Sequence, residues 1–146
     1  MSNNLKKVII ATGGTGGHVF PAYGLAMHLK NKKINTEIFS DKRGLEYLKN
    51  LKNIKKVKIF SSPIRKGLLN LSITSILIIL GIIKSLFLLL LKKPDIVFGM
   101  GGYSSFPVCF AAKILKIPFM IYENNICIGK TNKFLLPYAK KILVAF

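Results

Sequence analysis

The sequence predicts one α/β domain built on a doubly wound, Rossmann-like parallel sheet. Short runs rich in Val, Ile and Phe alternate along the chain with longer segments of helical character, and these runs are almost continuously apolar. Strands that are apolar on both faces and separated by helices form a parallel sheet that is covered on both sides. A chain of 146 residues suffices for one such domain with its core and is too short for two.

The elements are expected in strict alternation, without repeats or an interdomain linker. The short apolar runs predict strands at Lys6–Ala11, Thr36–Ser40, Val57–Phe60, Asp95–Phe98, Pro118–Tyr122 and Lys141–Phe146. The segments between them predict helices at His18–Asn31, Leu45–Leu51, Leu71–Leu91, Ser105–Leu115 and Thr131–Tyr138. The first and the fourth of these helices each follow a glycine-rich loop that comes directly after a strand.

The third predicted helix, Leu71–Leu91, is apolar enough to be considered as a membrane span. It carries a weak polar stripe near helical spacing, made of Asn70, Thr74, Gly81, Lys84 and Ser85. A span here would also separate the first three strands from the last three. We therefore expect a helix that covers the sheet and whose surplus apolar surface dips into a bilayer interface between flanking basic residues (Arg65, Lys66, Lys92 and Lys93). A spanning helix and a fully buried core helix are the alternatives.

The strongly basic composition favours an anionic membrane surface as a partner. The formal net charge is +18, yet only Arg43 and Arg65 among the 23 basic residues are Arg. Specific nucleic-acid readers are usually richer in Arg, because the guanidinium group matches phosphate bidentately, so nucleic-acid binding is not expected. Lysine serves as a point charge near lipid headgroups. The two isolated cysteines, Cys109 and Cys127, and the polar N-terminus without a signal peptide predict a reduced, cytoplasmic protein.

A glycine-rich loop, Gly13, Gly14, Thr15, Gly16 and Gly17, connects the first predicted strand to the first helix. Glycines let the backbone turn tightly and let a ligand approach without a Cβ in the way. The start of the helix directs unpaired N–H groups and a partial positive charge at the same point. The loop therefore predicts an anion site, and a phosphate is its natural occupant.

Two common phosphate loops do not fit this pattern. A Walker A loop requires Lys and then Ser or Thr after its last glycine, where this chain has His18 and Val19, and the third glycine of a dinucleotide fingerprint would fall at Val19. Asp41 lies just past the second strand, where a dinucleotide enzyme places a ribose-binding carboxylate. A dinucleotide-binding Rossmann domain is therefore kept as an alternative.

His18 is the candidate catalytic residue. An uncharged imidazole at the positive end of a helix, beside an anion site, is suited to accept a proton from an attacking hydroxyl. The alternative is that His18 only caps or positions the loop.

Two further segments fall at the same edge of the predicted sheet. A second glycine loop, with Gly101, Gly102, Tyr103 and Ser104, follows the fourth strand and opens a helix. Neighbouring strand ends form the crevice in which open α/β sheets bind ligands, so the pair of loops predicts two phosphates or a phosphate and a sugar. Glu123 follows the fifth strand and either holds loop amides or contacts a sugar hydroxyl. No D-x-D pair is present, so neither a metal nor a cofactor is expected.

Three motifs resemble those of the MurG family of glycosyltransferases. They are GGTGGHVFPA at Gly13–Ala22, GMGGYSSFP at Gly99–Pro107 and ENNICIGKTNKF at Glu123–Phe134. This family has two domains of the GT-B type. It transfers N-acetylglucosamine from UDP-N-acetylglucosamine to lipid I, undecaprenyl-pyrophosphoryl-N-acetylmuramoyl-pentapeptide, to form lipid II. The resemblance implies direct, inverting displacement without a metal, by an enzyme that is peripheral on the cytoplasmic face of the bacterial membrane.

The resemblance also implies roles for individual residues. The glycine loops hold the lipid pyrophosphate, and we assign Gly13, Gly14, Gly101, Gly102, Tyr103, Ser104 and Glu123 to the acceptor side. Residues Thr15, Gly16, Gly17 and Asn125 match family positions at the donor cleft, and His18 matches the candidate general base. The chain departs from the family pattern at Ser104, Phe106, Tyr122 and Asn124, where we expect Phe106 to place a bulky ring beside the crevice.

The chain as a whole corresponds to the N-terminal, acceptor-binding domain of the family, residues 1–146. We therefore expect it to lack the C-terminal donor-binding domain and to have negligible turnover alone. A half-enzyme that works with a separate C-terminal domain is the first interpretation. A catalytically silent module that still binds a lipid pyrophosphate is the second.

Overall fold

The computed structural model describes residues 5–63 and 68–145, with the backbone alone for residues 68–71. The strands of this part of the chain are β1 (Lys7–Thr12), β2 (Asn35–Ser40), β3 (Lys55–Lys58), β4 (Ile96–Gly99), β5 (Phe119–Glu123) and β6 (Lys141–Val144). They form one sheet in the order β3-β2-β1-β4-β5-β6, and every neighbouring pair is parallel. This is the order of a Rossmann-like sheet, so the predicted parallel α/β fold is confirmed.

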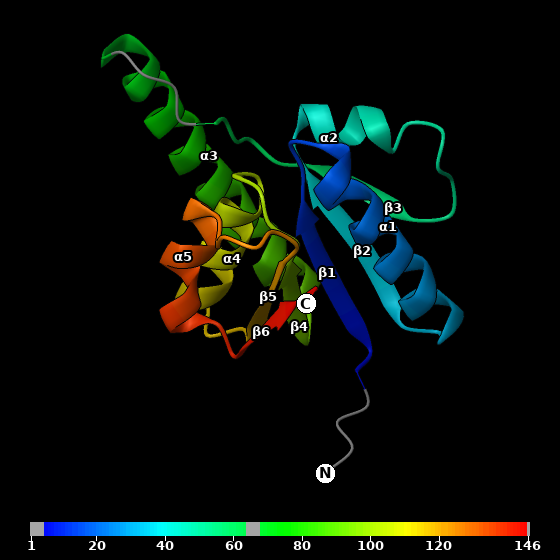
Figure 1. The fold of residues 1–146 in the computed structure, drawn as a ribbon. Helices are drawn as coiled ribbons and strands as arrows, with labels where there is room; N and C mark the ends of the chain where they lie inside the picture. The colour runs from blue at the N-terminus through cyan, green and yellow to red at the C-terminus, as the bar shows by residue number, and fades with distance from the viewer. Residues whose placement is uncertain (1–4, 64–67, 146) are drawn as a thin grey trace.

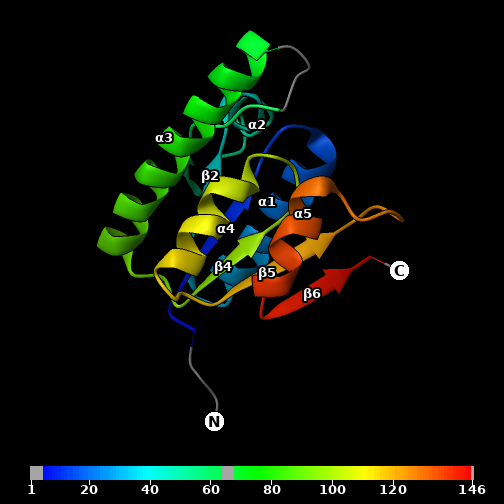
Figure 2. The same cartoon turned by 90° about the vertical axis from the view of Figure 1, so that its left-hand side faces the viewer.

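The helices cover both faces of the sheet. They are α1 (Gly16–Asn31), α2 (Lys42–Tyr47), α3 (Leu68–Lys92), α4 (Ser105–Ile114) and α5 (Lys130–Leu135), followed by a 3₁₀ turn at Leu136–Tyr138. Helices α1 and α2 lie on one face, and α3, α4 and α5 lie on the other (Figures 1 and 2). The central strand β1 is therefore buried on both sides: Val8 and Ile10 belong to the core under α1, whereas Ile9 and Ala11 belong to the core under α4.

Several predicted elements begin earlier in the structure than the sequence indicated, among them α2 and β3. Helix α2 begins at Lys42 instead of Leu45, because the side chain of Asp41 caps it by accepting a hydrogen bond from the backbone N–H of Gly44. Strand β3 occupies Lys55–Lys58 instead of Val57–Phe60, in register with the end of β2. The predicted flanking residues Arg65 and Lys66, and Phe146 at the predicted end of β6, lie outside the described residues.

Helix α3 packs several small and polar residues inward, together with Leu89, and turns many of its large apolar residues outward. Thr74, Gly81 and Ser85, three members of the predicted polar stripe, are buried. A Cβ on Gly81 would lie 2.1 Å from the carbonyl oxygen of Phe60, so only glycine permits this close approach. The outer face of α3 consists of side chains that are 46–65% exposed: Ile73, Ile76, Ile79, Leu80, Ile83, Phe87, Leu90 and Leu91. The alternative of a fully buried core helix is therefore wrong.

Helix α3 is also the helix, among the described residues, that is long and apolar enough to cross a membrane, over Ser72–Lys92. The strands on either side of it in sequence, β3 and β4, belong to the same sheet. In Figure 1 the N-terminal part of α3 extends beyond the body of the domain, on the side where the strands end. The apolar outer face therefore comes close to the carboxyl edge of the sheet.

Candidate active site at the carboxyl edge of the sheet

The first glycine loop lies between β1 and α1 and is packed too closely for side chains. A Cβ on Gly13 would lie 2.3 Å from Oδ1 of Asp41 and 2.4 Å from Oγ of Ser104. Gly14 has a φ of 81°, a conformation that side chains disfavour. The loop thus places bare backbone at the N-terminus of α1, as an anion site requires.

Asp41 joins three loops that are far apart in sequence. Its buried carboxylate accepts hydrogen bonds from the backbone N–H of Gly14 at 3.1 Å and of Gly44 at 3.0 Å. It also accepts a hydrogen bond from the hydroxyl of Tyr103, in the second glycine loop, at 3.0 Å. The carboxylate is therefore fully engaged within the protein, which argues against the ribose-binding role considered for it in a dinucleotide enzyme.

Tyr103 is held as a neutral hydrogen-bond donor in this cluster. Burial, then the charge of Asp41 and the hydrogen bond to it, raise the pKa of the Tyr103 hydroxyl above its ordinary value. The nearby positive charge of Arg43 acts in the opposite direction and lowers the pKa of Tyr103, but it does not outweigh burial and Asp41. The ring of Tyr103 lies against Gly14, where an added Cβ would be 3.3 Å from Cε1. The two glycine loops are thus in direct contact.

His18, in the first turn of α1, packs against the second glycine loop. A Cβ on Gly101 would lie 3.0 Å from Cε1 and Nδ1 of the imidazole, and one on Gly102 would lie 3.4 Å from Cδ2. Both glycines have positive φ, 84° and 75°. The buried Nδ1 has no hydrogen-bond partner among the described residues. The structure therefore brings the candidate base and both predicted loops to one place.

Glu123 organises the third predicted segment, after β5. Its buried carboxylate accepts hydrogen bonds from the backbone and side-chain N–H groups of Asn125, the backbone N–H of Gly129 and the side chain of Asn132, at 2.8–3.0 Å. Burial alone would raise the pKa of Glu123, but these hydrogen bonds outweigh it, and the pKa is lowered. Of the two roles considered for Glu123, this geometry favours holding the loop.

The neighbouring Asn124 links the third segment to α1. Its side-chain amide donates a hydrogen bond to the carbonyl oxygen of Gly17 at 3.1 Å. Asn125, by contrast, is exposed, as are Thr15 and Gly17. These predicted donor-side residues therefore lie at the surface of the same edge, and their contacts with a donor stay predictions.

The structure shows where two residues at the start of α4, Ser104 and Phe106, direct their side chains. The side chain of Ser104 is fully buried, and its hydroxyl lies 3.2 Å from that of Ser61. A direct ligand contact by this side chain is therefore not favoured. Phe106 stacks on Phe110 at 5.5 Å between ring centroids and meets Phe134 edge-on at 5.4 Å. The ring of Phe106 thus packs between α4 and α5, and its effect on the acceptor stays a prediction.

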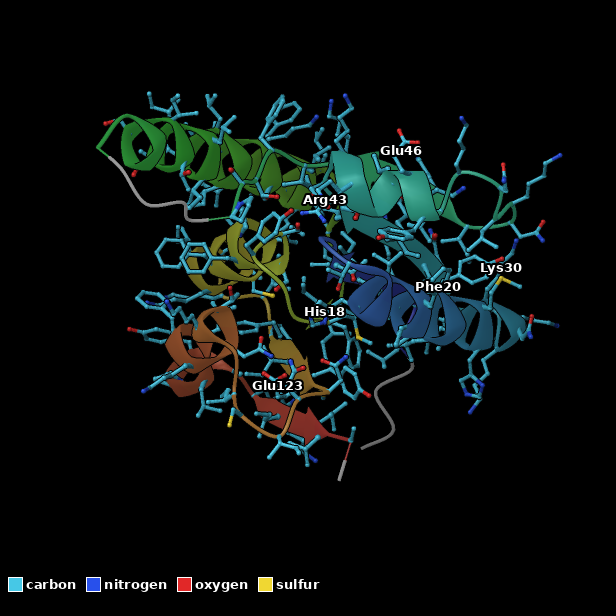
Figure 3. The ribbon with its side chains drawn as sticks, turned by 45° about the horizontal axis from the view of Figure 1, so that its top comes forward. His18, Phe20, Lys30, Arg43, Glu46 and Glu123 are labelled. Carbon is cyan, nitrogen blue, oxygen red and sulfur yellow. The ribbon has the colours of Figure 1, made fainter. Side chains whose placement is uncertain are left out.

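Sequence reasoning missed three residues at this edge. Arg43 and Tyr47 are exposed one turn apart on α2, and Phe20 of α1 forms an edge-to-face pair with Tyr47 at 6.0 Å. Figure 3 shows Arg43, His18 and Glu123 in succession along the edge that faces the viewer. The rarity of arginine in this lysine-rich chain is the sequence signal that would have singled out Arg43.

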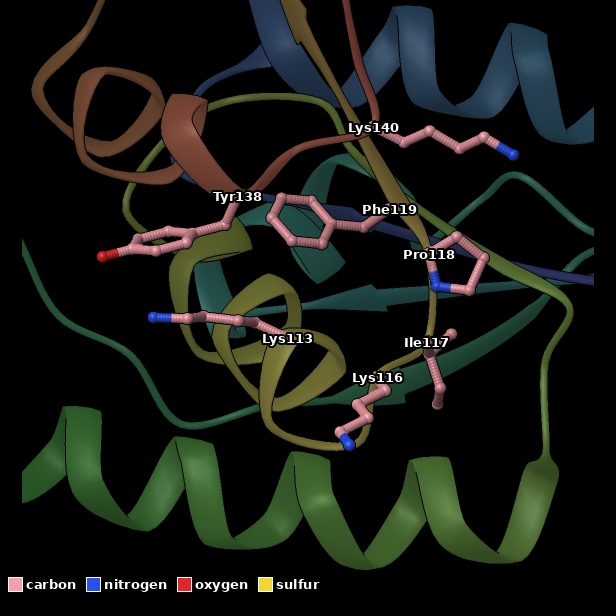
Figure 4. A pocket seen from close by; sticks show the side chains of 7 residues that line it. All are labelled: Lys113, Lys116, Ile117, Pro118, Phe119, Tyr138 and Lys140. Carbon is pink, nitrogen blue, oxygen red and sulfur yellow. The ribbon is translucent and has the colours of Figure 1, made fainter.

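A cavity at the opposite edge of the sheet does not form a comparable site. It measures about 360 Å³ and is lined by three lysines together with Tyr138 and the start of β5. Figure 4 shows that the ammonium groups of Lys113, Lys116 and Lys140 point in different directions, and that of Lys113 lies 3.3 Å above the ring of Tyr138. The positive charges do not converge on one point, so the carboxyl edge is the candidate site.

The fold and this edge define a class: a Rossmann-like domain that presents two joined glycine loops and a histidine at the carboxyl ends of its strands. Residues 8–144 match the model of the glycosyltransferase family 28 N-terminal domain. The chain therefore belongs to this family of glycosyltransferases, as its N-terminal domain.

Individual relatives agree with this assignment. The chain is 40% identical over 138 residues to the UDP-N-acetylglucosamine–N-acetylmuramyl-(pentapeptide) pyrophosphoryl-undecaprenol N-acetylglucosamine transferase of Pelagibacter ubique, covering 94% of this chain and 38% of that protein. The crystal structure of Acinetobacter baumannii MurG superposes with a TM-score of 0.83 at 31% identity, over 97% of this chain and 42% of that one. A UDP-GlcNAc 2-epimerase from Methanocaldococcus jannaschii, 17% identical with a TM-score of 0.71 over 97% of this chain and 40% of that one, shares the fold. The chain thus spans about two fifths of the length of these relatives.

Proposed function

We propose that this chain is the acceptor-binding part of a glycosyltransferase that moves N-acetylglucosamine from UDP-N-acetylglucosamine to lipid I, yielding lipid II. The observation that carries the proposal is the meeting of both glycine loops around His18, with Asp41 joining them. The similarity to the Pelagibacter ubique transferase supports the choice of substrates. No metal or other cofactor is part of the proposed reaction.

In this proposal the glycine loops bind the pyrophosphate of the acceptor. The backbone of Gly13, Gly14, Gly101 and Gly102 faces the N-termini of α1 and α4, where N–H groups and the helix dipoles favour negative charge. Tyr103 lines the loop, and Glu123 shapes the neighbouring segment without direct contact. Thr15, Gly16, Gly17 and Asn125 lie toward the donor.

His18 is proposed as the general base. It accepts the proton of the attacking sugar hydroxyl while that oxygen displaces UDP from the anomeric carbon, which inverts the configuration. His18 is partly exposed at the loops, and side chains at Gly101 and Gly102 would crowd its imidazole, which supports a sugar hydroxyl approaching it there. A second domain of the GT-B type, joined in the same polypeptide or supplied separately, would contribute most contacts to UDP-N-acetylglucosamine.

The outer face of α3 is proposed to dock the domain on the cytoplasmic surface of an anionic bacterial membrane, as a peripheral protein. Its exposed Ile, Leu and Phe side chains would bury in the interface while the many lysines contact headgroups. Because the N-terminal part of α3 extends past the carboxyl edge (Figure 1), a lipid-linked acceptor would reach the glycine loops directly from the bilayer.

Binding and transfer are measured separately to test the proposal. The chain should bind a lipid I analogue and should transfer N-acetylglucosamine only when a C-terminal domain from a two-domain relative is supplied. The variant His18→Ala should abolish transfer while binding stays nearly intact, whereas equal loss of both would contradict the base assignment. Binding without restored transfer would favour the silent binding module, and no binding at all would reject both.

A further inference from the structure

Arg43 is fixed beside the first glycine loop by the backbone around it. It occupies the first turn of α2, between Asp41 and Gly44. The carboxylate of Asp41 accepts hydrogen bonds from the backbone N–H groups of both Gly44 and Gly14. Its position therefore depends on the same carboxylate that joins the glycine loops.

The side chain of Arg43 is exposed and faces the loops. Arg43 lies close enough to the hydroxyl of Tyr103 to lower its pKa, against the larger opposing effects of burial and Asp41, and the ring of Tyr103 lies against Gly14. Within the described residues, the salt bridges join Glu37 to Lys55 and to Lys92. No carboxylate in this part of the chain therefore forms a salt bridge with Arg43. A guanidinium without a paired carboxylate, beside bare backbone at a helix N-terminus, is an arrangement that suits phosphate oxygens.

We infer that Arg43 binds the diphosphate of the lipid-linked acceptor and that the Tyr103–Asp41 pair orients it. The inference rests on the proposed function, because it assigns the anion to the acceptor. The guanidinium fork contacts phosphate oxygens bidentately from the α2 side while the glycine loops contact the diphosphate from the α1 and α4 side. Arg43 thus acts at the opposite side of the first loop from His18 (Figure 3).

Calorimetric titration of the full chain tests this contact with two probes, a lipid I analogue with a shortened prenyl chain and inorganic pyrophosphate. Arg43→Gln should lower the affinity for both probes by roughly tenfold or more, the usual loss for a charged hydrogen-bonding group. Arg43→Lys should fall between wild type and Arg43→Gln, because an ammonium keeps the charge and loses the fork. The matched control is Lys42→Gln, which removes the same charge from the adjacent exposed residue and should weaken binding less than about twofold.

The outcomes distinguish a failure of the proposed Arg43–diphosphate contact from a failure of the proposed function. Equal affinities of Arg43→Gln and Lys42→Gln for both probes would overturn the role of Arg43 and leave the proposed function standing. Binding of pyrophosphate that depends on Arg43, with no binding of the lipid I analogue, would reject the acceptor as the ligand and the proposed function with it. Thermal unfolding of each variant, expected at the wild-type midpoint because both side chains are exposed, shows that the fold is retained.

Discussion

The carboxyl edge of the sheet and the outer face of α3 are built in opposite ways. At the edge, two buried carboxylates, Asp41 and Glu123, each hold several backbone and side-chain donors, so the loops have one arrangement. On the outer face of α3, large apolar side chains project outward and are about half or more exposed. A site that recognises specific groups needs the first kind of surface, whereas a surface that partitions into a bilayer needs only the second.

Asp41→Ala should have the largest effect on stability, because it leaves three hydrogen-bond donors of three loops without their acceptor. We expect a loss of about 3–5 kcal/mol in the free energy of unfolding, measured by urea denaturation. The control is Asp95→Ala, which removes an exposed carboxylate that accepts hydrogen bonds from the backbone of Lys6 and Lys7. Its cost should be about 1 kcal/mol. Equal costs would mean that Asp41 does not hold the loops together.

Glu123→Gln should destabilise the protein less than Asp41→Ala, and the size of its effect should depend on pH. At neutral pH the amide replaces one acceptor oxygen, so we expect a loss of about 2 kcal/mol. The pKa of Glu123 is lowered in the folded state. The ionised carboxylate therefore stabilises the fold fully above the unfolded pKa of about 4.3, and this stabilisation is lost as pH falls through the folded pKa. Unfolding free energies measured from pH 7 down to pH 3 should therefore converge for wild type and variant. A constant difference across this range would contradict the assignment.

The sequence predicted where the ligand edge lies better than it predicted what the side chains there do. Strand–helix alternation and two glycine runs locate the edge, because the carboxyl ends of parallel strands share one side of the sheet. Two hydrogen-bond donors to Asp41, Gly14 and Tyr103, are 27 and 62 residues away from it in sequence. No local sequence pattern therefore predicts these contacts. For the same reason the sequence did not predict that Ser104 is buried, with its hydroxyl beside that of Ser61, 43 residues away.

The polar stripe of α3 shows a second limit of sequence reasoning. Helical spacing identified Thr74, Gly81 and Ser85 as one face, but spacing does not tell which face meets the protein. Close contact with Phe60 and with Pro107 of α4 requires small residues, so the small and polar face is buried and the apolar face is exposed. Toward its C-terminal end the inner face also carries Leu89, which is buried in the core. An outward face of large apolar residues is nevertheless the reverse of a soluble amphipathic helix.

Gly81→Ala should test the inner face of α3. The added methyl group would meet the carbonyl oxygen of Phe60, so we expect a loss of about 1–3 kcal/mol despite the better helix propensity of alanine. Gly24→Ala is the matched control, because an added Cβ in α1 meets nothing within 4 Å. It should stabilise the protein by about 0.5–1 kcal/mol. Chemical denaturation measures both, and stabilisation by both would show that α3 does not pack this closely.

Ile76→Ser/Ile83→Ser should have the smallest effect on folding, because both side chains are more than half exposed. Unfolding free energy should change by no more than about 0.5 kcal/mol for each substitution. Affinity for anionic phospholipid vesicles should nevertheless fall on the order of tenfold, since apolar area no longer enters the interface. Leu5→Ser/Ile142→Ser removes two other exposed apolar side chains, at 39% and 38% exposure, and should leave vesicle affinity unchanged. Sedimentation with vesicles compares the two pairs, and equal affinities would mean that the lysines alone, and not the outer face of α3, attach the domain to the membrane.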